Sequence, residues 1–230
     1  MPMTLYGSLA SPYVARVAMF ADLKGIDLSM EAAPGGMGSD EYKQLNLTGK
    51  IPGLETGDGC ITESDVICQY LEALHPEPTL IPSEPLARAQ TLMVSRMTDL
   101  YIAPHNSPLR AHKDPANRDQ AVVDRQAELF AQGFAYVAHY MGPGPFAVAD
   151  VPGLGDCALA PFIGMLKQTV FPFFAEIEDP TSGNGRLATW WQALEAHPVC
   201  GPSIEAYDAA LEKFLAWLSE MLKKRGLPGG

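Results

Sequence analysis

The residues Ser11-Pro12-Tyr13 combine a hydroxyl with the start of a helix. An apolar run at 4–6 and a small-residue turn precede them, and apolar residues at helical spacing follow from Val14. Serine suits the N-cap and proline the first helical position. A hydroxyl at the positive end of a helix can hold an anion such as a thiolate or a carboxylate. The alternative is that Ser11 only caps the helix.

A second segment, Lys50-Ile51-Pro52, places a proline directly before a β-like run. A cis Ile51-Pro52 bond would turn the backbone N–H and C=O of Ile51 toward solvent. Those groups can pair with an extended, peptide-like ligand as an added strand does. The alternative is an ordinary trans proline that protects the start of a strand.

The third segment, Glu63-Ser64, lies where a strand gives way to a helix. Helical N–H groups and the Ser64 hydroxyl can bind a carboxylate, while Glu63 can bind an ammonium group. A γ-glutamyl group carries one of each. The alternative is again helix capping, with Asp65 favoured by the helix dipole.

The elements that must position these residues are short. Strands are predicted at 4–6 and 28–32, parallel because a helix connects them. A hairpin joins 54–56 to 60–62 through Gly57-Asp58-Gly59, and a helix follows from Ser64 to Leu74. Its predicted buried face consists of Val66, Ile67, Tyr70, Leu71 and Leu74. The order β-α-β-α-β-β-α matches the layout of a thioredoxin-like domain.

Prolines at 76, 78, 82 and 85 indicate a stiff connection after this unit. From Leu86 onward the sequence shows no strand, and helices are predicted at 86–106, 116–141, 154–170, 186–196, 204–207 and 211–224. We therefore expect an α/β N-terminal thioredoxin-like domain over 1–79, a linker over 80–87, and an all-α C-terminal helical bundle over 88–230.

Composition excludes several classes of function. The net charge of −11 gives no electrostatic support for nucleic-acid binding. The N-terminus lacks the pattern of a signal peptide, and no run reaches the ~18 apolar residues of a membrane span. The four cysteines, Cys60, Cys68, Cys157 and Cys200, and the five histidines lack zinc-ligand spacing. We expect reduced thiols, no metal, no membrane contact and a cytoplasmic location.

Taken together, the three segments resemble the cytosolic glutathione S-transferase family over nearly the whole chain. Ser11-Pro12-Tyr13 with Arg16-Val17 resembles the serine type, closest in motif to the tau class and also similar to the zeta and omega classes. Lys50-Ile51-Pro52 resembles the cis-proline loop of the family. Glu63-Ser64 resembles its γ-glutamyl motif. A serine in place of cysteine at 11 disfavours exchange through a mixed disulfide.

The resemblance implies glutathione as co-substrate. Ser11 would stabilise its thiolate, and Tyr13, Lys50, Ile51, Pro52, Glu63 and Ser64 would surround it. Lys50 would pair with the glycine carboxylate, Ile51 would hold the cysteinyl backbone, and Glu63 with Ser64 would hold the γ-glutamyl end.

The second half carries further resemblance and two departures. Gly155-Asp156-Cys157 resembles the capping motif of a core helix, but Gly153 stands where Ser or Thr is usual. The segment 103–108, with two prolines, breaks the first bundle helix and can reshape the acceptor pocket. Candidates for that pocket are Tyr13, Met97, Tyr101 and His105, with packing in the core as the alternative. Arg110 and His112 can meet an acidic substrate or simply face water.

The function implied is attack of glutathione on a small hydrophobic electrophile. Alternatives are a glutathione-dependent isomerase, dehalogenase or ether-cleaving enzyme, or a non-catalytic binding or regulatory protein. The resemblance also implies a homodimer. In support, the helix from Ser64 is expected to leave Asp65, Cys68, Gln69 and Glu72 opposite its buried side, and Leu92, Met93, Arg96 and Leu100 form a mixed stripe.

Overall fold

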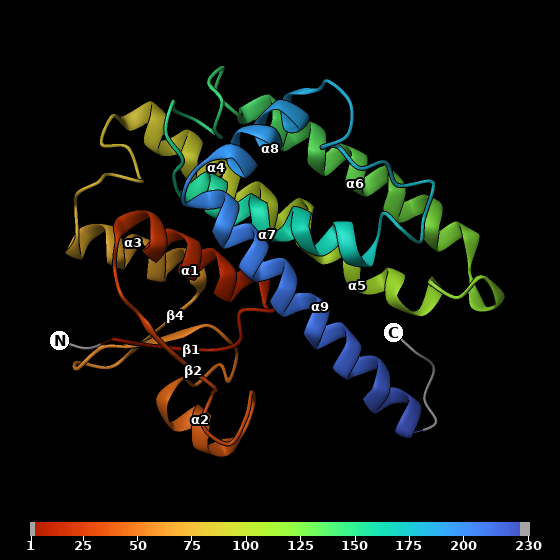
Figure 1. The fold of residues 1–230 in the computed structure, drawn as a ribbon, viewed down its shortest axis with the longest axis horizontal. Helices are drawn as coiled ribbons and strands as arrows, with labels where there is room; N and C mark the ends of the chain where they lie inside the picture. The colour runs from red at the N-terminus through yellow and green to blue at the C-terminus, as the bar shows by residue number, and fades with distance from the viewer. Residues whose placement is uncertain (1–2, 226–230) are drawn as a thin grey trace.

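The computed structural model describes residues 3–225 and shows a small mixed sheet with its helices, followed by a helical bundle (Figure 1). The strands are β1 (Thr4–Tyr6), β2 (Ser29–Glu31), β3 (Gly53–Glu55) and β4 (Cys60–Thr62), in the order β2-β1-β3-β4. β1 and β2 are parallel, as predicted, and the other two pairs are antiparallel. Helices α1 (Pro12–Lys24) and α3 (Ser64–Leu74) lie on one side of the sheet, and α2 (Asp40–Leu45) lies on the other (Figure 1).

Helix α1 begins and ends at residues that favour helix termini. Ser11 is extended at the N-cap and Pro12 occupies the first turn. Gly25 ends the helix in the left-handed region, at φ 65°, where its N–H reaches the carbonyls of Ala21 and Asp22. Val14, Val17 and Phe20 are fully buried between the sheet and the bundle. The helix that carries Ser11 is therefore held on both sides.

The buried face of α3 differs from the prediction. Ile67 and Leu71 are fully buried, but Val66 and Leu74 are about half exposed, and Cys68, expected on the opposite side, is completely buried. Polar bonds explain this rotation. Asp65 accepts a 2.6 Å bond from the Ser95 hydroxyl, and Glu72 accepts the backbone N–H groups of Leu80 and Ile81. The polar side of α3 is thus turned toward the rest of the protein.

The second half is all helical. Its helices are α4 (Pro85–Tyr101), α5 (Asn106–Leu109), α6 (Gln120–Tyr140), α7 (Leu154–Thr169), α8 (Arg186–Ala196) and α9 (Cys200–Lys224), with short 3₁₀ turns η1 (Ala103–His105), η2 (Arg110–His112) and η3 (Pro115–Asn117). α4 starts inside the segment predicted as linker. It stops at Tyr101 because Pro104 has no N–H to donate to the carbonyl of Leu100 and its ring crowds that carbonyl. The two helices predicted at 204–207 and 211–224 are one, since Asp208-Ala209-Ala210 contains no helix breaker.

One continuous core joins the two halves, and the start of α7 lies at its centre. The buried carboxylate of Asp156 accepts N–H bonds of 2.8 Å from Gly153, Ala147 and the fully buried Trp190. A Cβ on Gly153 would lie 2.6 Å from the carbonyl oxygen of Leu80. The close approach of the 75–84 connection therefore accounts for glycine where the resemblance led us to expect Ser or Thr. Within residues 3–225, no helix is long and apolar enough to cross a bilayer.

Candidate active site

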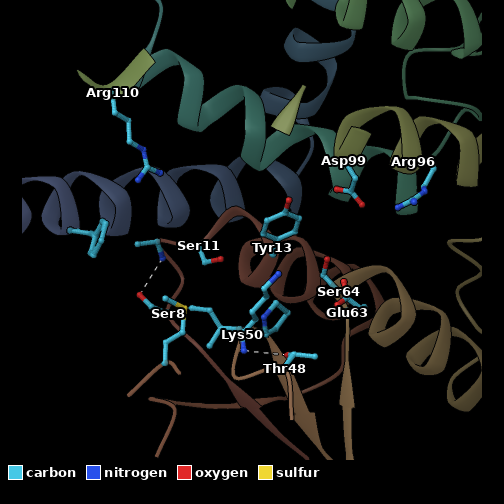
Figure 2. Close-up of a pocket in the computed structure, with 15 residues that line it drawn as sticks. Ser8, Ser11, Tyr13, Thr48, Lys50, Glu63, Ser64, Arg96, Asp99 and Arg110 are labelled. Atoms are coloured by element: carbon cyan, nitrogen blue, oxygen red, sulfur yellow. Dashed lines mark hydrogen bonds between the residues drawn. The ribbon is translucent and has the colours of Figure 1, made fainter. Parts of the chain in front are cut away.

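A cavity of about 790 Å³ opens beside the N-terminus of α1, lined by both the sheet unit and the helical bundle (Figure 2). The residues that line it are Ser8, Ala10, Ser11, Tyr13, Met37, Thr48, Lys50, Ile51, Pro52, Glu63, Ser64, Arg96, Asp99, Arg110 and Phe214. Seven positions predicted from sequence, namely Ser11, Tyr13, Lys50, Ile51, Pro52, Glu63 and Ser64, thus come together around one space.

The Ser11 hydroxyl lines this cavity and does not cap its helix. Ser11 has the extended backbone of an N-cap residue, yet its side chain makes no capping bond. Its backbone is fixed instead: the Ser11 N–H donates to Ser8 over 2.9 Å, and the Ser11 carbonyl accepts from Ala15 over 2.9 Å. The hydroxyl is therefore free to donate to a bound group at the positive end of α1.

The loop before β3 is held from behind and open toward the cavity. The Asn46 side chain donates to the carbonyl of Lys50 over 2.8 Å and accepts from the backbone and hydroxyl of Thr48. The Ile51-Pro52 bond is cis, as the resemblance to a cis-proline loop implied. In the part of the chain that is described, neither the N–H nor the C=O of Ile51 makes a hydrogen bond. An extended ligand can pair with this residue as a strand would.

Glu63 and Ser64 stand at the start of α3. Glu63 has φ 66°, and across residues 3–225 it is the one non-glycine residue with positive φ. Such a conformation costs of order 1–3 kcal/mol and is typical of functional sites. Its carboxylate makes no capping bond. Ser64 is buried but reaches the cavity, so the carboxylate, the hydroxyl and the first N–H groups of α3 meet at one point.

Tyr13 and the residues behind it connect the two halves of the cavity. The Tyr13 ring packs edge-on against Phe162 at 5.1 Å, and burial raises the pKa of its hydroxyl. The guanidinium of Arg16 lies 5.5 Å from this ring and is fully buried. Arg16 makes a two-pronged ion pair with Asp99 of α4, at 2.5 and 3.1 Å. Asp99 lines the cavity beside Arg96.

Three residues proposed for an acceptor pocket are not among those lining the cavity. Met97 packs against the core, and Tyr101 stacks edge-on against Tyr136 at 5.2 Å. His105 turns toward α6, where its Nδ1 lies 3.1 Å from the Gln126 side-chain oxygen. The end of α4 at Tyr101 explains the placement of His105, since it directs the following turns against α6. Gly133 of α6 permits this approach, because a Cβ there would overlap the Tyr101 carbonyl.

The sequence did not predict most of the cavity-lining residues that lie outside the three motifs. Ser8, Ala10, Met37, Thr48, Asp99 and Phe214 were not proposed, and Arg96 was considered only for a dimer interface. Arg110 was expected either to meet an acidic substrate or to face water, and its side chain lines the cavity. Thr48 could have been found, since it lies two residues before Lys50. Phe214 could not, because nothing in its helical pattern separates it from a core aromatic residue.

The cavity offers complementary groups for a short thiol peptide. It contains a hydroxyl at a helix N-terminus, an exposed lysine, an open backbone edge and a carboxylate beside a serine. Tyr6 of β1 is less suited than Ser11 to donate a hydrogen bond to a thiolate. Its hydroxyl donates to Glu55 over 2.5 Å, which with burial raises the pKa of Tyr6 to about 12. Among the described residues, no three His, Cys, Asp or Glu side chains are placed to hold a metal ion.

Comparison with known proteins shows the family of this chain. The models for the N-terminal and C-terminal domains of glutathione S-transferases match residues 5–79 and 120–193. The chain is 30% identical to maleylacetoacetate isomerase of Pseudomonas aeruginosa over 167 residues, covering 69% of this chain and 79% of that protein. It is 31% identical to a probable glutathione S-transferase of Zea mays over 207 residues, covering 85% and 87%.

Among solved structures, a glutathione S-transferase of Methylobacterium radiotolerans in complex with glutathione sulfonate superposes with a TM-score of 0.70 at 26% identity. It covers 89% of this chain and 95% of that one. The family models, the identity to relatives over most of the chain and the shared fold all agree. The chain belongs to the glutathione S-transferase family.

Proposed function

We propose that the protein is a glutathione transferase that stabilises the glutathione thiolate with Ser11 for attack on a small electrophile. The observation that carries this proposal is the Ser11 hydroxyl, which occupies the N-cap of α1, makes no capping bond and lines the cavity. We assign the serine type, closest in motif to the tau class, since Ser11 stands where the mechanism needs a hydrogen-bond donor. The presence of Lys50, Glu63 and Ser64 around the same cavity as Ser11 favours an enzyme over a non-catalytic binding protein.

The proposed pose follows from charge and hydrogen bonding. The ammonium of Lys50 pairs with the glycine carboxylate of glutathione, and the open backbone of Ile51 pairs with the cysteinyl residue. At the γ-glutamyl end, Ser64 and the N-terminus of α3 take the carboxylate, while Glu63 takes the ammonium group. The cysteinyl residue, which lies between these two ends along the peptide, then directs its thiol toward Ser11.

The chemistry is nucleophilic substitution by sulfur. The glutathione thiol loses its proton to water, and the Ser11 O–H donates a hydrogen bond to the resulting thiolate. The sulfur lone pair forms a carbon–sulfur bond with the electrophile, and the leaving group departs with its bonding pair. Ser11 is never covalently modified, because its part is electrostatic stabilisation of the developing and ground-state anion.

A glutathione-dependent isomerase is the second candidate, and the similarity to maleylacetoacetate isomerase favours it. The same thiolate would add to a conjugated double bond, allow rotation and leave again. Glutathione would then be regenerated and would not appear in the product. Mass analysis of the product therefore separates the two reactions.

Two further assignments complete the proposal. We place the protein in the cytoplasm, in agreement with four cysteines that are free thiols. We also propose a homodimer, because Val66 on α3 and Leu100 on α4 expose apolar surface, with the exposed Arg96 beside Leu100 on α4.

The test combines binding with turnover. Calorimetry with reduced glutathione and conjugation of 1-chloro-2,4-dinitrobenzene should both succeed with the unmodified chain. Lys50→Ala should weaken glutathione binding by about tenfold, the worth of one charge-assisted hydrogen bond. Lys223→Ala, which removes an exposed lysine at the far end of α9, is the matched control and should change neither result. Absence of glutathione binding by the unmodified chain would refute the proposal.

A further inference from the structure

The cavity has a half that the proposed glutathione pose leaves unused. Lys50, Glu63 and Ser64 lie to one side of Ser11, whereas Arg110 lies on the other side and extends from the helical bundle (Figure 2). Phe214 of α9 also lines the cavity and comes from the bundle. A second substrate that meets the thiolate at Ser11 has this half to occupy.

Arg110 is held on an anchored turn. It follows directly after α5, whose Asn106 and Leu109 are buried. The Asn106 side chain donates to the sulfur of Met165 over 3.4 Å and accepts from the Thr169 hydroxyl over 3.4 Å, which ties α5 to α7. The early end of α4 creates this turn. The backbone beneath Arg110 is therefore fixed, while its side chain is exposed to the cavity.

The guanidinium of Arg110 has no protein acceptor among the residues described. No hydrogen bond or ion pair within residues 3–225 involves its side chain. The carboxylates nearest in sequence are engaged elsewhere. Asp114 accepts from the Ala116 N–H over 2.9 Å and from the Asn117 side chain over 3.1 Å. Asp119 caps α6 through the N–H of Ala121.

The electrostatic surroundings also favour an anion here. Burial, and to a smaller extent the nearby charge of Arg110, lowers the pKa of the Lys113 ammonium. Two like charges are thus kept near each other in a chain whose net charge is −11. A positive charge on the cavity wall with a second one nearby favours a bound carboxylate over a neutral or cationic group.

Phe214 supplies the apolar part of the same region. Its side chain is 42% exposed, and its ring lies 5.8 Å from that of Trp217. Large aromatic side chains exposed beside a cavity are typical of ligand sites, where they contact the apolar body of a molecule. Arg110 and Phe214 together therefore match a ligand with an aromatic or aliphatic body and one anionic end.

We propose that Arg110 binds the carboxylate of an acidic electrophile whose apolar body lies against Phe214, which places the reacting carbon toward Ser11. This inference rests on the proposed transferase function and narrows its second substrate from hydrophobic electrophiles in general to electrophilic carboxylic acids. Arg110 acts as a specificity-determining residue and takes no part in the bond changes.

The test compares two acceptors of the same reactivity class. They are 1-chloro-2,4-dinitrobenzene, which is neutral, and 4-chloro-3,5-dinitrobenzoate, which carries a carboxylate. For Arg110→Gln we expect kcat/KM for the benzoate to fall by about tenfold, the effect of one charge-assisted hydrogen bond near solvent. Values for the neutral acceptor and KM for glutathione should stay within about twofold. Added salt should reduce the preference of the unmodified protein for the benzoate.

Controls distinguish the role proposed for Arg110 from the proposed transferase function on which it rests. Arg88→Gln removes an exposed arginine of α4 that does not line the cavity and should leave both acceptors unaffected. Calorimetry with the glutathione conjugates of the two acceptors gives a second readout that is independent of turnover. If Arg110→Gln weakens both conjugates equally, or raises KM for glutathione, the assignment of Arg110 to an acidic acceptor is wrong. If the unmodified chain conjugates neither acceptor, the transferase proposal itself is wrong.

Discussion

Replacing Ser11 with alanine should separate thiolate stabilisation from every other role of this residue. The change removes only the hydroxyl. Within residues 3–225 that hydroxyl has no hydrogen-bond partner, so the backbone bonds of Ser11 to Ser8 and Ala15 persist in the variant. We therefore expect the helix, the cavity and glutathione binding to survive, and the pKa of the bound thiol to rise.

The magnitude follows from the groups at the site. A free thiol has a pKa near 8.5, and each unit of depression corresponds to ~1.4 kcal/mol. A hydrogen bond to a charged group contributes roughly 1.5–3 kcal/mol, and a helix N-terminus adds about 0.3–1 kcal/mol. The hydroxyl thus accounts for about one to two units, and the helix for less than one. We expect a thiol pKa near ~6.5 in the unmodified complex and ~8 in Ser11→Ala.

The assay is an ultraviolet titration of the thiolate in the complex, together with kcat/KM for the neutral aryl halide against pH. Because thiolate is the reactive form, the acid limb of both curves should move to higher pH in Ser11→Ala. The loss of rate should be greatest, about tenfold to hundredfold, below the raised pKa. It should narrow above pH ~9, where the thiol ionises without help.

Ser39→Ala is the matched control. The Ser39 side chain does cap its helix, accepting from the Tyr42 N–H over 3.0 Å. Its loss should lower the free energy of unfolding by about 1 kcal/mol, the usual worth of a cap, and leave the thiol pKa unchanged. Ser11→Ala should leave the free energy of unfolding unchanged and raise the thiol pKa. An unchanged thiol pKa and pH profile in Ser11→Ala would remove Ser11 from the mechanism.

Further predictions concern stability, pH and assembly. Asp99→Asn leaves the buried charge of Arg16 without its partner and should cost roughly 3–5 kcal/mol in urea unfolding, whereas Glu128→Gln breaks the exposed pair with Arg125 and should cost under about 0.5 kcal/mol. Burial raises the pKa of Asp156 from 3.8 to about 6, so its favourable contribution is complete below pH ~4 and is lost as pH rises through ~6. Unfolding at several pH values should show the stability difference between the unmodified chain and Asp156→Asn falling across that window, and a constant difference would contradict the assignment. Sedimentation equilibrium at micromolar concentration should give twice the chain mass of 24.8 kDa; the monomer mass would contradict the homodimer.

Local signals in the sequence predicted the elements that begin or end at clear turn or helix-capping residues. The parallel pair β1 and β2, the hairpin at Gly57-Asp58-Gly59 and the start of α3 at Ser64 all follow from turn and capping residues. The buried face of α3 did not, because helical periodicity identifies an apolar stripe but not what its polar side meets. The bonds from Asp65 to Ser95 and from Glu72 to the 75–84 connection decide that orientation.

The candidate site divides in the same way. The half proposed to bind glutathione consists of residues that carry local motifs, so Ser11, Lys50 and Glu63 could be named from sequence. The other half is assembled from η2 and α9, roughly one hundred to two hundred residues later in the chain. Arg110 enters the cavity because α4 stops early, and Phe214 enters because α9 continues without a break. Neither the early end of α4 nor the length of α9 leaves a local sequence pattern from which the distance of these side chains to Ser11 could be predicted.

The position of Ser11 depends on the helical bundle as much as on the sheet. α1 packs on α3, and also on α7 and α9. Between one and two turns after Ser11, the buried guanidinium of Arg16 is fixed by the two oxygens of Asp99 on α4. A donor must be held within about 0.5 Å to stabilise charge effectively. The bundle therefore does more than receive the electrophile: it fixes the helix whose N-terminus supplies both the dipole and the hydroxyl. Loss of the Arg16 guanidinium should consequently raise the thiol pKa as well as lower stability, although Arg16 does not donate to sulfur, because it removes both the tie to α4 and a nearby positive charge.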